Sequence, residues 1–252
     1  MQFEDIKIED IKNIALKAGD AIMKIYNKDF HIEYKDDKSP LTQADLKSNE
    51  IICEALKRLY PDIALMSEEN KQTEYDIRKN WEYYWCIDPI DGTKEFIKKN
   101  GEFTVNIALI HKNSPVLGVV YAPALDDMYS SKQGEGAYKN NQKLPLQINT
   151  TPKEKLFVVA SKSHLSKETQ EFIDNLDTKK ITQVSKGSSL KLCMVAEGIA
   201  DIYPRLAPTM EWDTAAADAI VRESGKMTYQ FESNEPMIYN KENLLNPWFV
   251  VK

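Results

Sequence analysis

The sequence predicts a layered α/β fold with an antiparallel central sheet, and two observations lead to that expectation. Helical and β-rich segments follow one another in blocks, with helices first, then strands, then helices, strands and a helix again. The strands of the central block are separated by turns too short for the crossovers that parallel neighbours need. We therefore do not expect a doubly wound parallel sheet.

The first half of the chain supplies two helices and the central strands. Apolar residues recur at helical spacing over 6–26, and a second helical pattern runs over about 43–60. Two short apolar segments that end in acids, 62–69 and 82–89, read as strands. The region 103–147 alternates β-branched or aromatic runs with turn residues, which predicts an antiparallel meander.

The second half alternates shorter elements. Short apolar runs in this half indicate strands, and apolar residues at helical spacing, in places followed by a glycine stop signal, indicate helices. They predict strands at 155–164 and 200–205, and helices at 166–176, 188–198 and 212–225.

The chain shows no internal repeat, low-complexity tract or Gly/Ser-rich linker. Its 252 residues, 42% hydrophobic and 29% charged, are typical of an ordinary globular protein with a substantial core. We treat residues 1–252 as one unit, with approximate subdomains 1–150 and 151–252.

Charge and cysteine content exclude several functions. A net charge of −6 argues against a non-specific nucleic-acid binder, and the three widely spaced cysteines favour neither disulfides nor a zinc site. No apolar run is long enough to span a membrane, and the N-terminal residues lack the layout of a signal peptide. We expect a cytoplasmic location, with peripheral membrane association left open.

The stretch WCIDPIDGTKEF places two carboxylates that repel each other on one tight corner. One interpretation is a hairpin, because Asp-Gly between apolar runs is a strong turn signal. The other is a divalent cation, because a hard metal takes oxygen ligands and cancels the repulsion. Pro89 stiffens the corner, so that Asp88, Asp91 and the Ile90 carbonyl oxygen can converge.

Further acids end predicted strands or begin predicted helices. Glu68 follows a strand, Asp45 opens the second helix and Asp213 opens the last one. Gly92 and Thr93 begin a turn or helix whose N–H groups would attract an anion such as phosphate. Two metal ions about 3.5–4 Å apart would stabilise the attacking and leaving oxygens of a displacement on phosphorus. Taken singly, each acid also has a structural interpretation as a turn, a solvated loop or a helix cap.

Taken together, the motifs DPIDGTKEF, SEE and WDTAA resemble those of the inositol monophosphatase superfamily, whose members are magnesium-dependent, lithium-sensitive phosphatases. The resemblance covers almost the whole chain and implies the αβαβα sugar-phosphatase-like fold. It also implies two magnesium ions held by Glu68, Asp88, the Ile90 carbonyl, Asp91 and Asp213, with Asp45 assisting a weaker third. The catalytic residues would be Glu68, Asp88 and Thr93, with Thr93 paired to Glu68 to orient and deprotonate the nucleophilic water.

Within that superfamily, KGSSLK, VAEG, YPR and PTMEWDTAA resemble the bisphosphate nucleotidases. The resemblance implies hydrolysis of adenosine 3',5'-bisphosphate to AMP and phosphate. The phosphate that is not cleaved needs its own cationic site, which Lys191 and Arg205 would supply. The implied substrate contacts are Ile90, Asp91, Gly92, Thr93, Ser161, His164, Ser188, Lys191, Arg205 and Asp213.

Alternatives stay open at this point. An inositol-phosphate or fructose-bisphosphate phosphatase would use the same metal chemistry on a sugar phosphate, and Lys191 and Arg205 would then be surface charges. A regulatory nucleotide-binding protein without turnover is a different class. We expect a small phosphorylated nucleotide as the partner, no nucleic acid and no integral membrane segment, and a monomer or a homodimer.

Overall fold

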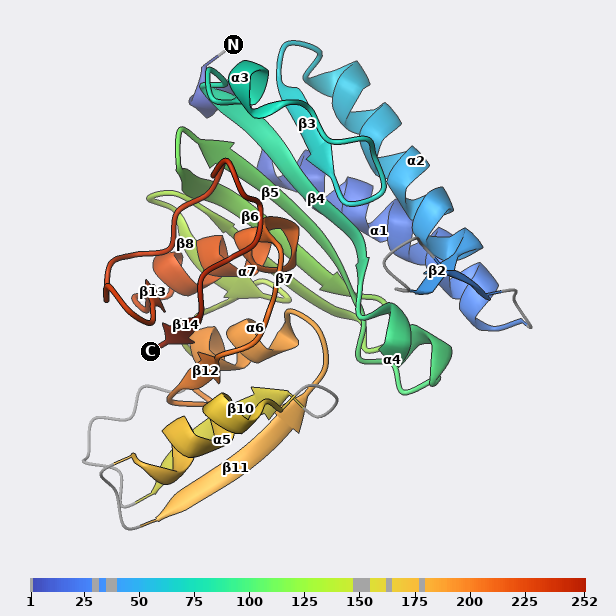
Figure 1. Cartoon of the computed structure of the whole chain (residues 1–252). Helices are drawn as coiled ribbons and strands as arrows, with labels where there is room; N and C mark the ends of the chain where they lie inside the picture. The colour runs from blue at the N-terminus through green and yellow to red at the C-terminus, as the bar shows by residue number, and fades with distance from the viewer. Residues whose placement is uncertain (1, 29–31, 35–39, 147–154, 162–164, 177–179) are drawn as a thin grey trace.

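The computed structural model describes residues 2–28, 32–34, 40–146, 155–161, 165–176 and 180–252. The elements stack in space as five layers (Figure 1). The layers are two long helices, a large sheet, a second pair of helices, a small sheet and one further helix. This confirms the layered α/β fold. No helix among the described residues is both long and apolar enough to cross a membrane. The boundary between subdomains at about 150 stays a prediction.

The helices begin close to where the periodicity predicts them. A 3-10 turn, η1 (Phe3–Asp5), precedes α1. The helices are α1 (Ile8–Tyr26), α2 (Gln43–Leu59), α3 (Tyr75–Arg78), α4 (Thr93–Ile97), α5 (Lys167–Asp174), α6 (Leu190–Glu197) and α7 (Glu211–Glu223). Gly198 ends α6 in the left-handed conformation with φ of 80°, as the glycine stop signal predicts.

The strands form one large sheet and three small ones. The large sheet has the order β3-β4-β5-β6-β7-β8-β9. Its strands are β3 (Ala64–Ser67), β4 (Tyr83–Asp91), β5 (Thr104–His111), β6 (Ser114–Ala122), β7 (Asp127–Lys132), β8 (Gly136–Lys139) and β9 (Gln142–Lys143). The small sheets pair β1 (Ile32–Tyr34) with β2 (Pro40–Thr42), β10 (Leu156–Ser161) with β11 (Ile181–Lys186), and β14 (Phe249–Val251) with both β12 (Tyr203–Arg205) and β13 (Thr228–Gln230).

The meander from β4 to β9 is antiparallel throughout, as predicted. The edge strand β3 differs, because it pairs with β4 in parallel. The connection through α3 is long enough for the crossover that a parallel pair requires. This exception brings the carboxyl ends of β3 and β4 to the same edge of the sheet.

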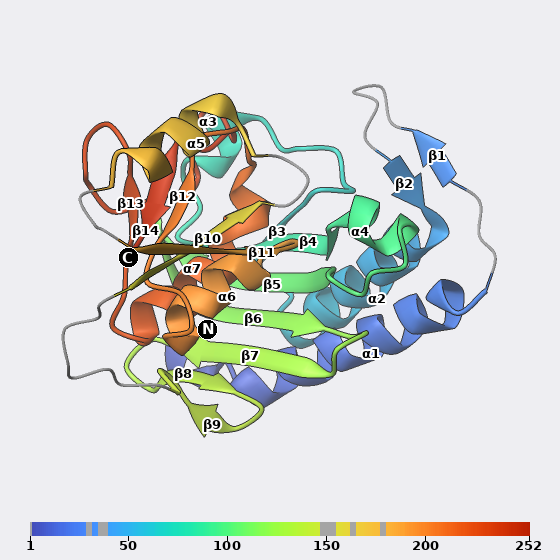
Figure 2. The same ribbon diagram turned by 90° about the horizontal axis from the view of Figure 1, so that it is seen from below.

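Both faces of the large sheet are buried, so its strands read as continuous apolar runs. Along β4, Trp85 and Ile87 pack toward α1 and α2, while Tyr84 and Cys86 pack toward α6 and α7. Figure 2 shows β5, β6 and β7 side by side between these helices. The helices packed on both faces of the sheet therefore hold the end of β4 in place.

Helix α7 lies unusually close to the sheet at Gly118 on β6. A Cβ atom at position 118 would stand 2.1 Å from the carbonyl oxygen of Ala216 and 2.8 Å from Cβ of Ala219. Only glycine fits this approach, and small residues on α7 complete it. The contact fixes the height of α7, and Asp213 lies in the first turn of that helix.

We predict that Gly118→Ala destabilises the protein by about 3 kcal/mol or more, at the upper end of the range for overpacking, because backbone and not a flexible side chain must move. Urea unfolding measures the change. The control is Ser114→Ala, an exposed site on the same strand, which should stay within about 0.5 kcal/mol of the parent. Equal stability of Gly118→Ala and the parent would contradict the close packing of α7 on β6.

Candidate active site

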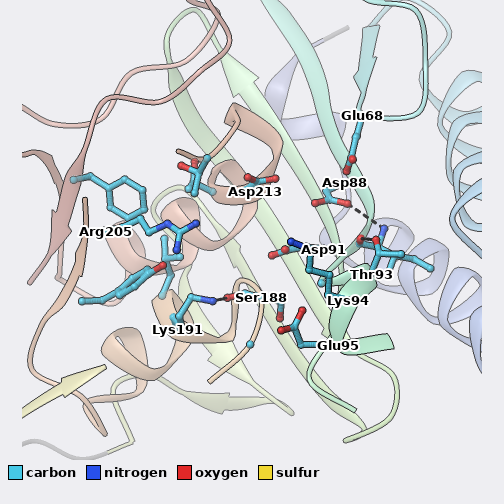
Figure 3. Close-up of a pocket in the computed structure, with 18 residues that line it drawn as sticks. Glu68, Asp88, Asp91, Thr93, Lys94, Glu95, Ser188, Lys191, Arg205 and Asp213 are labelled. Carbon is cyan, nitrogen blue, oxygen red and sulfur yellow. Dashed lines mark hydrogen bonds between the residues drawn. The ribbon is translucent and has the colours of Figure 1, made fainter. Parts of the chain in front are cut away.

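A cavity of about 280 Å³ lies where the large sheet, α4, α6, α7 and β12 meet. Four acids that the sequence singles out line it, namely Glu68, Asp88, Asp91 and Asp213. Lys191 and Arg205 line the same cavity. Figure 3 shows Arg205 and Lys191 on one side, Glu68 and Asp88 on the other, and Asp91 between them.

The DPID corner is a β-bulge and not a hairpin. The pairing of β4 with β5 shifts register between Asp88 and Asp91. The Ile90 N–H donates to Asp88 Oδ1 at 3.1 Å, and Ser48 Oγ donates to the Pro89 carbonyl at 2.8 Å. The bulge turns both aspartates toward the cavity, and Gly92, in the left-handed conformation with φ of 92°, leads directly into α4.

Glu68 reaches the same cavity because β3 runs parallel to β4. Its N–H donates to the Ile87 carbonyl at 3.1 Å, which places Glu68 beside Asp88. Burial raises the pKa of Asp88 well above its usual range, and the negative charges of Glu68, Asp91 and Asp213 raise it further. The end of β4 therefore holds a carboxylate, Asp88, whose ionisation is disfavoured, with Glu68 beside it.

Asp213 closes the acidic side from α7. Its Oδ2 accepts a hydrogen bond from the Met210 N–H at 2.8 Å, so the helix-cap interpretation is confirmed. Asp213 also lines the cavity, and loss of hydration followed by the charge of Asp91 raises its pKa to about 8. One carboxylate thus both caps the helix and faces the other acids.

The donor atoms on the acidic side of the cavity fit a hard divalent cation. The oxygen ligands available are carboxylates and the Ile90 carbonyl. Burial, with neighbouring negative charges second, raises the pKa values of Asp88, Asp91 and Asp213, and a cation would favour their charged forms. Among the described residues, no three acidic, histidine or cysteine side chains already stand together as a formed ligand cluster. The fit therefore rests on donor type and shared charge.

Thr93 contacts an acid that the sequence analysis does not pair with it. Its hydroxyl donates to Asp45 Oδ1 at 3.1 Å, with the Ile90 carbonyl at 3.3 Å, and the pairing of Thr93 with Glu68 on the nucleophilic water stays a prediction. Asp45 is 2% exposed, and its Oδ2 accepts from the Thr42 N–H at 2.8 Å and the Thr42 hydroxyl at 2.6 Å. The capping box at the start of α2 aims Oδ1 of Asp45 at Thr93.

The cationic side is built by the first turn of α6, the residues just before it and β12. Lys191 is 7% exposed, and its Nζ donates to the Ser188 carbonyl at 2.6 Å and lies 5.8 Å from the ring centroid of Tyr203. Burial lowers the pKa of Lys191 to about 8, with Asp91 acting to raise it and Arg205 to lower it further. Arg205 thus disfavours the charge of Lys191 in the cavity that both line.

The other predicted contacts have different outcomes. Ser188 lines the cavity, and its buried hydroxyl has no hydrogen-bond partner within the described part of the chain. Ser161 is the last residue of β10, and His164 lies outside the described residues. Sequence reasoning missed Glu95 and Ser189, although both lie inside the motifs it quoted.

The family model described as the inositol monophosphatase family matches residues 4–247. The chain belongs to the inositol monophosphatase family. A "3'(2'),5'-bisphosphate nucleotidase CysQ" of Salmonella typhimurium is 44% identical over 246 residues, covering 97% of this chain and 98% of that protein. A protein of the same name from Escherichia coli K12 is 42% identical over 247 residues, with the same coverage.

Solved structures agree with the family assignment. The crystal structure of CysQ from Bacteroides thetaiotaomicron, described as a bacterial member of the inositol monophosphatase family, superposes with a TM-score of 0.88 at 43% identity. The superposition covers 97% of this chain and 96% of the Bacteroides chain. The suhB protein of Bartonella henselae shares the fold, with a TM-score of 0.78 at 24% identity over 96% of this chain and 92% of that one.

We predict that the metal-free protein loses stability as pH rises from about 4 to about 8. The pKa of Asp213 is about 8 in the folded state and about 4 when unfolded. The folded state therefore binds more protons in this window, and raising the pH favours unfolding. Urea unfolding at several pH values in a chelator measures the slope, which Asp213→Asn should flatten.

Two further results bear on this prediction. Magnesium should restore more stability at pH 8 than at pH 5, because the cation replaces the missing protons. Asp62→Asn, at an exposed site, is the matched control and should keep the parent slope. A slope that Asp213→Asn leaves unchanged would contradict the electrostatic account of the cavity.

Proposed function

We propose that the protein is a magnesium-dependent 3'(2'),5'-bisphosphate nucleotidase that hydrolyses the 3'-phosphate of adenosine 3',5'-bisphosphate to AMP and phosphate. The observation that carries the proposal is one cavity that combines clustered acids with cations, in which Lys191 and Arg205 lie on the side opposite Glu68 and Asp88. A substrate with two phosphates matches both sides. The relatives named as nucleotidases, at 42% and 44% identity over nearly the full chain, support it.

The acidic side is where the metal would bind. Glu68, Asp88, Asp91, Asp213 and the Ile90 carbonyl would hold two magnesium ions, which would act as Lewis acids on the phosphoryl oxygens. A third ion at Asp45 has less support, because the two oxygens of that carboxylate already accept three hydrogen bonds.

We assign Asp45 to the positioning of Thr93. The charged acceptor draws the proton of the Thr93 hydroxyl toward Asp45, which leaves the lone pairs of Oγ1 facing the cavity. A water molecule can then donate to Thr93 and present its own lone pair to the phosphorus. Thr93 would orient the nucleophile, and Asp45 behind it would favour removal of the water proton.

The cationic side would hold the phosphate that is not cleaved. Lys191 is buried near Arg205, and an anion between them would relieve their repulsion and favour the protonated amine. The unpartnered hydroxyl of Ser188 can donate to the same substrate. This side separates a bisphosphate from a monophosphate.

We predict that Thr93→Ala lowers kcat by about 10²–10⁴-fold while magnesium affinity stays near the parent value, because the variant removes a water-orienting group and no metal ligand. The control is Thr93→Ser, which keeps the hydroxyl and should retain most of the activity. Steady-state kinetics and calorimetric magnesium binding give the two quantities. An unchanged kcat in Thr93→Ala would exclude this role for Thr93.

We predict that Arg205→Ala lowers kcat/KM for adenosine 3',5'-bisphosphate by about 10–100-fold, the size of one charge-assisted contact. Adenosine 3'-monophosphate lacks the 5'-phosphate, so its already lower kcat/KM should change little. Arg58→Ala, at an exposed site on α2, is the control for loss of an arginine. Equal losses on both substrates would make Arg205 structural.

The same phosphate-release assay tests the proposed substrate class. The parent enzyme should prefer adenosine 3',5'-bisphosphate over inositol 1-phosphate and fructose 1,6-bisphosphate in kcat/KM. A higher value for either sugar phosphate would replace the nucleotidase proposal with the other phosphatase activity.

A further inference from the structure

Ser189 joins three parts of the site through one hydroxyl group. The residue is 1% exposed and directly precedes α6. Its Oγ lies 2.7 Å from Asp91 Oδ2 and 2.9 Å from the Asp213 carbonyl oxygen, and it accepts from Asn106 Nδ2 at 2.7 Å. The strands β4 and β5, the helix α7 and the loop before α6 therefore meet at a single atom.

The single proton of the Ser189 hydroxyl favours one of its two possible acceptors. It carries one proton, and the charged carboxylate of Asp91 is both the nearer acceptor and the stronger one. Asn106, 1% exposed on β5, occupies a lone pair of Oγ and so limits the rotation of the hydroxyl. The bond holds Oδ2 of Asp91 and fixes the orientation of the carboxylate at the cavity.

The same residue also joins the loop before α6 to the first turn of that helix. Ser188 precedes Ser189, and Lys191 follows it by two residues in α6. Both line the cavity, and Lys191 Nζ donates to the Ser188 carbonyl at 2.6 Å. The Gly187 N–H donates to Glu102 Oε2 at 2.9 Å, which fixes the other end of the loop. A displacement of this loop would therefore move the hydroxyl that orients Asp91.

We propose that Ser189 is a positioning residue that couples the metal side to the nucleotide side, so that magnesium and a 5'-phosphate bind cooperatively. This inference rests on the proposed function, because it assigns Asp91 to the metal. Partners that orient metal ligands typically change metal affinity by about 10–100-fold when removed. Coupling is reciprocal, so each ligand should tighten the other by the same factor.

The first test is calorimetric titration of magnesium into the parent protein and three variants. Ser189→Ala should bind magnesium about 10–100-fold more weakly than the parent. Asn106→Ala keeps the Ser189 hydroxyl but frees its rotation, so its loss should be smaller and in the same direction. Ser131→Ala removes a buried hydroxyl on β7 that has no partner among the described residues, and it should bind like the parent.

The second test repeats the titration with AMP, which carries the 5'-phosphate. AMP should tighten magnesium binding to the parent, and the tightening factor should fall toward one in Ser189→Ala. If the role of Ser189 is purely structural, Ser189→Ala should have a lower urea midpoint but the parent's magnesium affinity and the parent's tightening of magnesium binding by AMP.

The possible outcomes separate the two proposals. A parent protein that binds no magnesium would overturn the proposed function. A parent that binds magnesium with the same affinity as Ser189→Ala, or as Asn106→Ala if Ser189→Ala does not fold, would overturn the positioning role alone. Weakened magnesium binding with an unchanged AMP effect would overturn the coupling.

Discussion

The repulsion among Asp88, Asp91, Asp213 and Glu68 is the interaction on which the rest of the site depends. Left to themselves, four carboxylates on flexible segments would move apart or take up protons. They face one cavity because rigid elements hold them, namely a bulge at the end of β4, a parallel neighbour strand and the capped first turn of α7. Burial, with the neighbouring negative charges second, raises the pKa values of Asp88 and Asp213, so confinement in the cavity disfavours their charged forms.

The repulsion among these acids also explains why cationic side chains line the same cavity. A site that held only carboxylates would repel a phosphate, whereas Lys191 and Arg205 offset that charge on the opposite side. Lys191 is itself disfavoured as a cation, because burial and Arg205 lower its pKa to about 8. A cation bound among the acids and an anion bound at Lys191 and Arg205 would favour the charged forms of both groups.

The sequence was sufficient for the layers and the acids, because both depend on local patterns. Helical spacing, glycine stops and the DPIDGT string each report on neighbouring residues, and α1, α2 and α7 begin within a few residues of the predictions. The strand β11 was missed because its residues are polar and partly exposed, so it lacks the apolar alternation of a buried strand. The parallel pairing of β3 was missed because nothing local in ALMS reports the direction of its partner.

The polar contacts inside the site could not be predicted from sequence, because they join residues far apart in the chain. Thr93 bonds Asp45, 48 residues away, and Ser189 bonds Asp91, 98 residues away. The sequence showed that Asp45 opens the second helix, but the direction in which its carboxylate oxygen points depends on how α2 packs against β4. Family resemblance supplied the ligand types, and only the fold supplied their partners.

Two acids on the first turn of α7 show how the fold separates structural from reactive charge. Glu211 is fully buried, and it accepts from Lys241 Nζ at 2.6 Å and from the N–H groups of Asn240 and Lys241 at 2.8 and 2.9 Å. Asp213 accepts the Met210 N–H at 2.8 Å, and its side chain lines the cavity together with Asp91. Glu211 is thus paired within the protein and ties residues 240–241 to the helix, whereas Asp213 faces the cavity that we propose holds the cation. The contacts of Glu211 hold the first turn of α7 in place, and Asp213 keeps its position in the cavity with that turn.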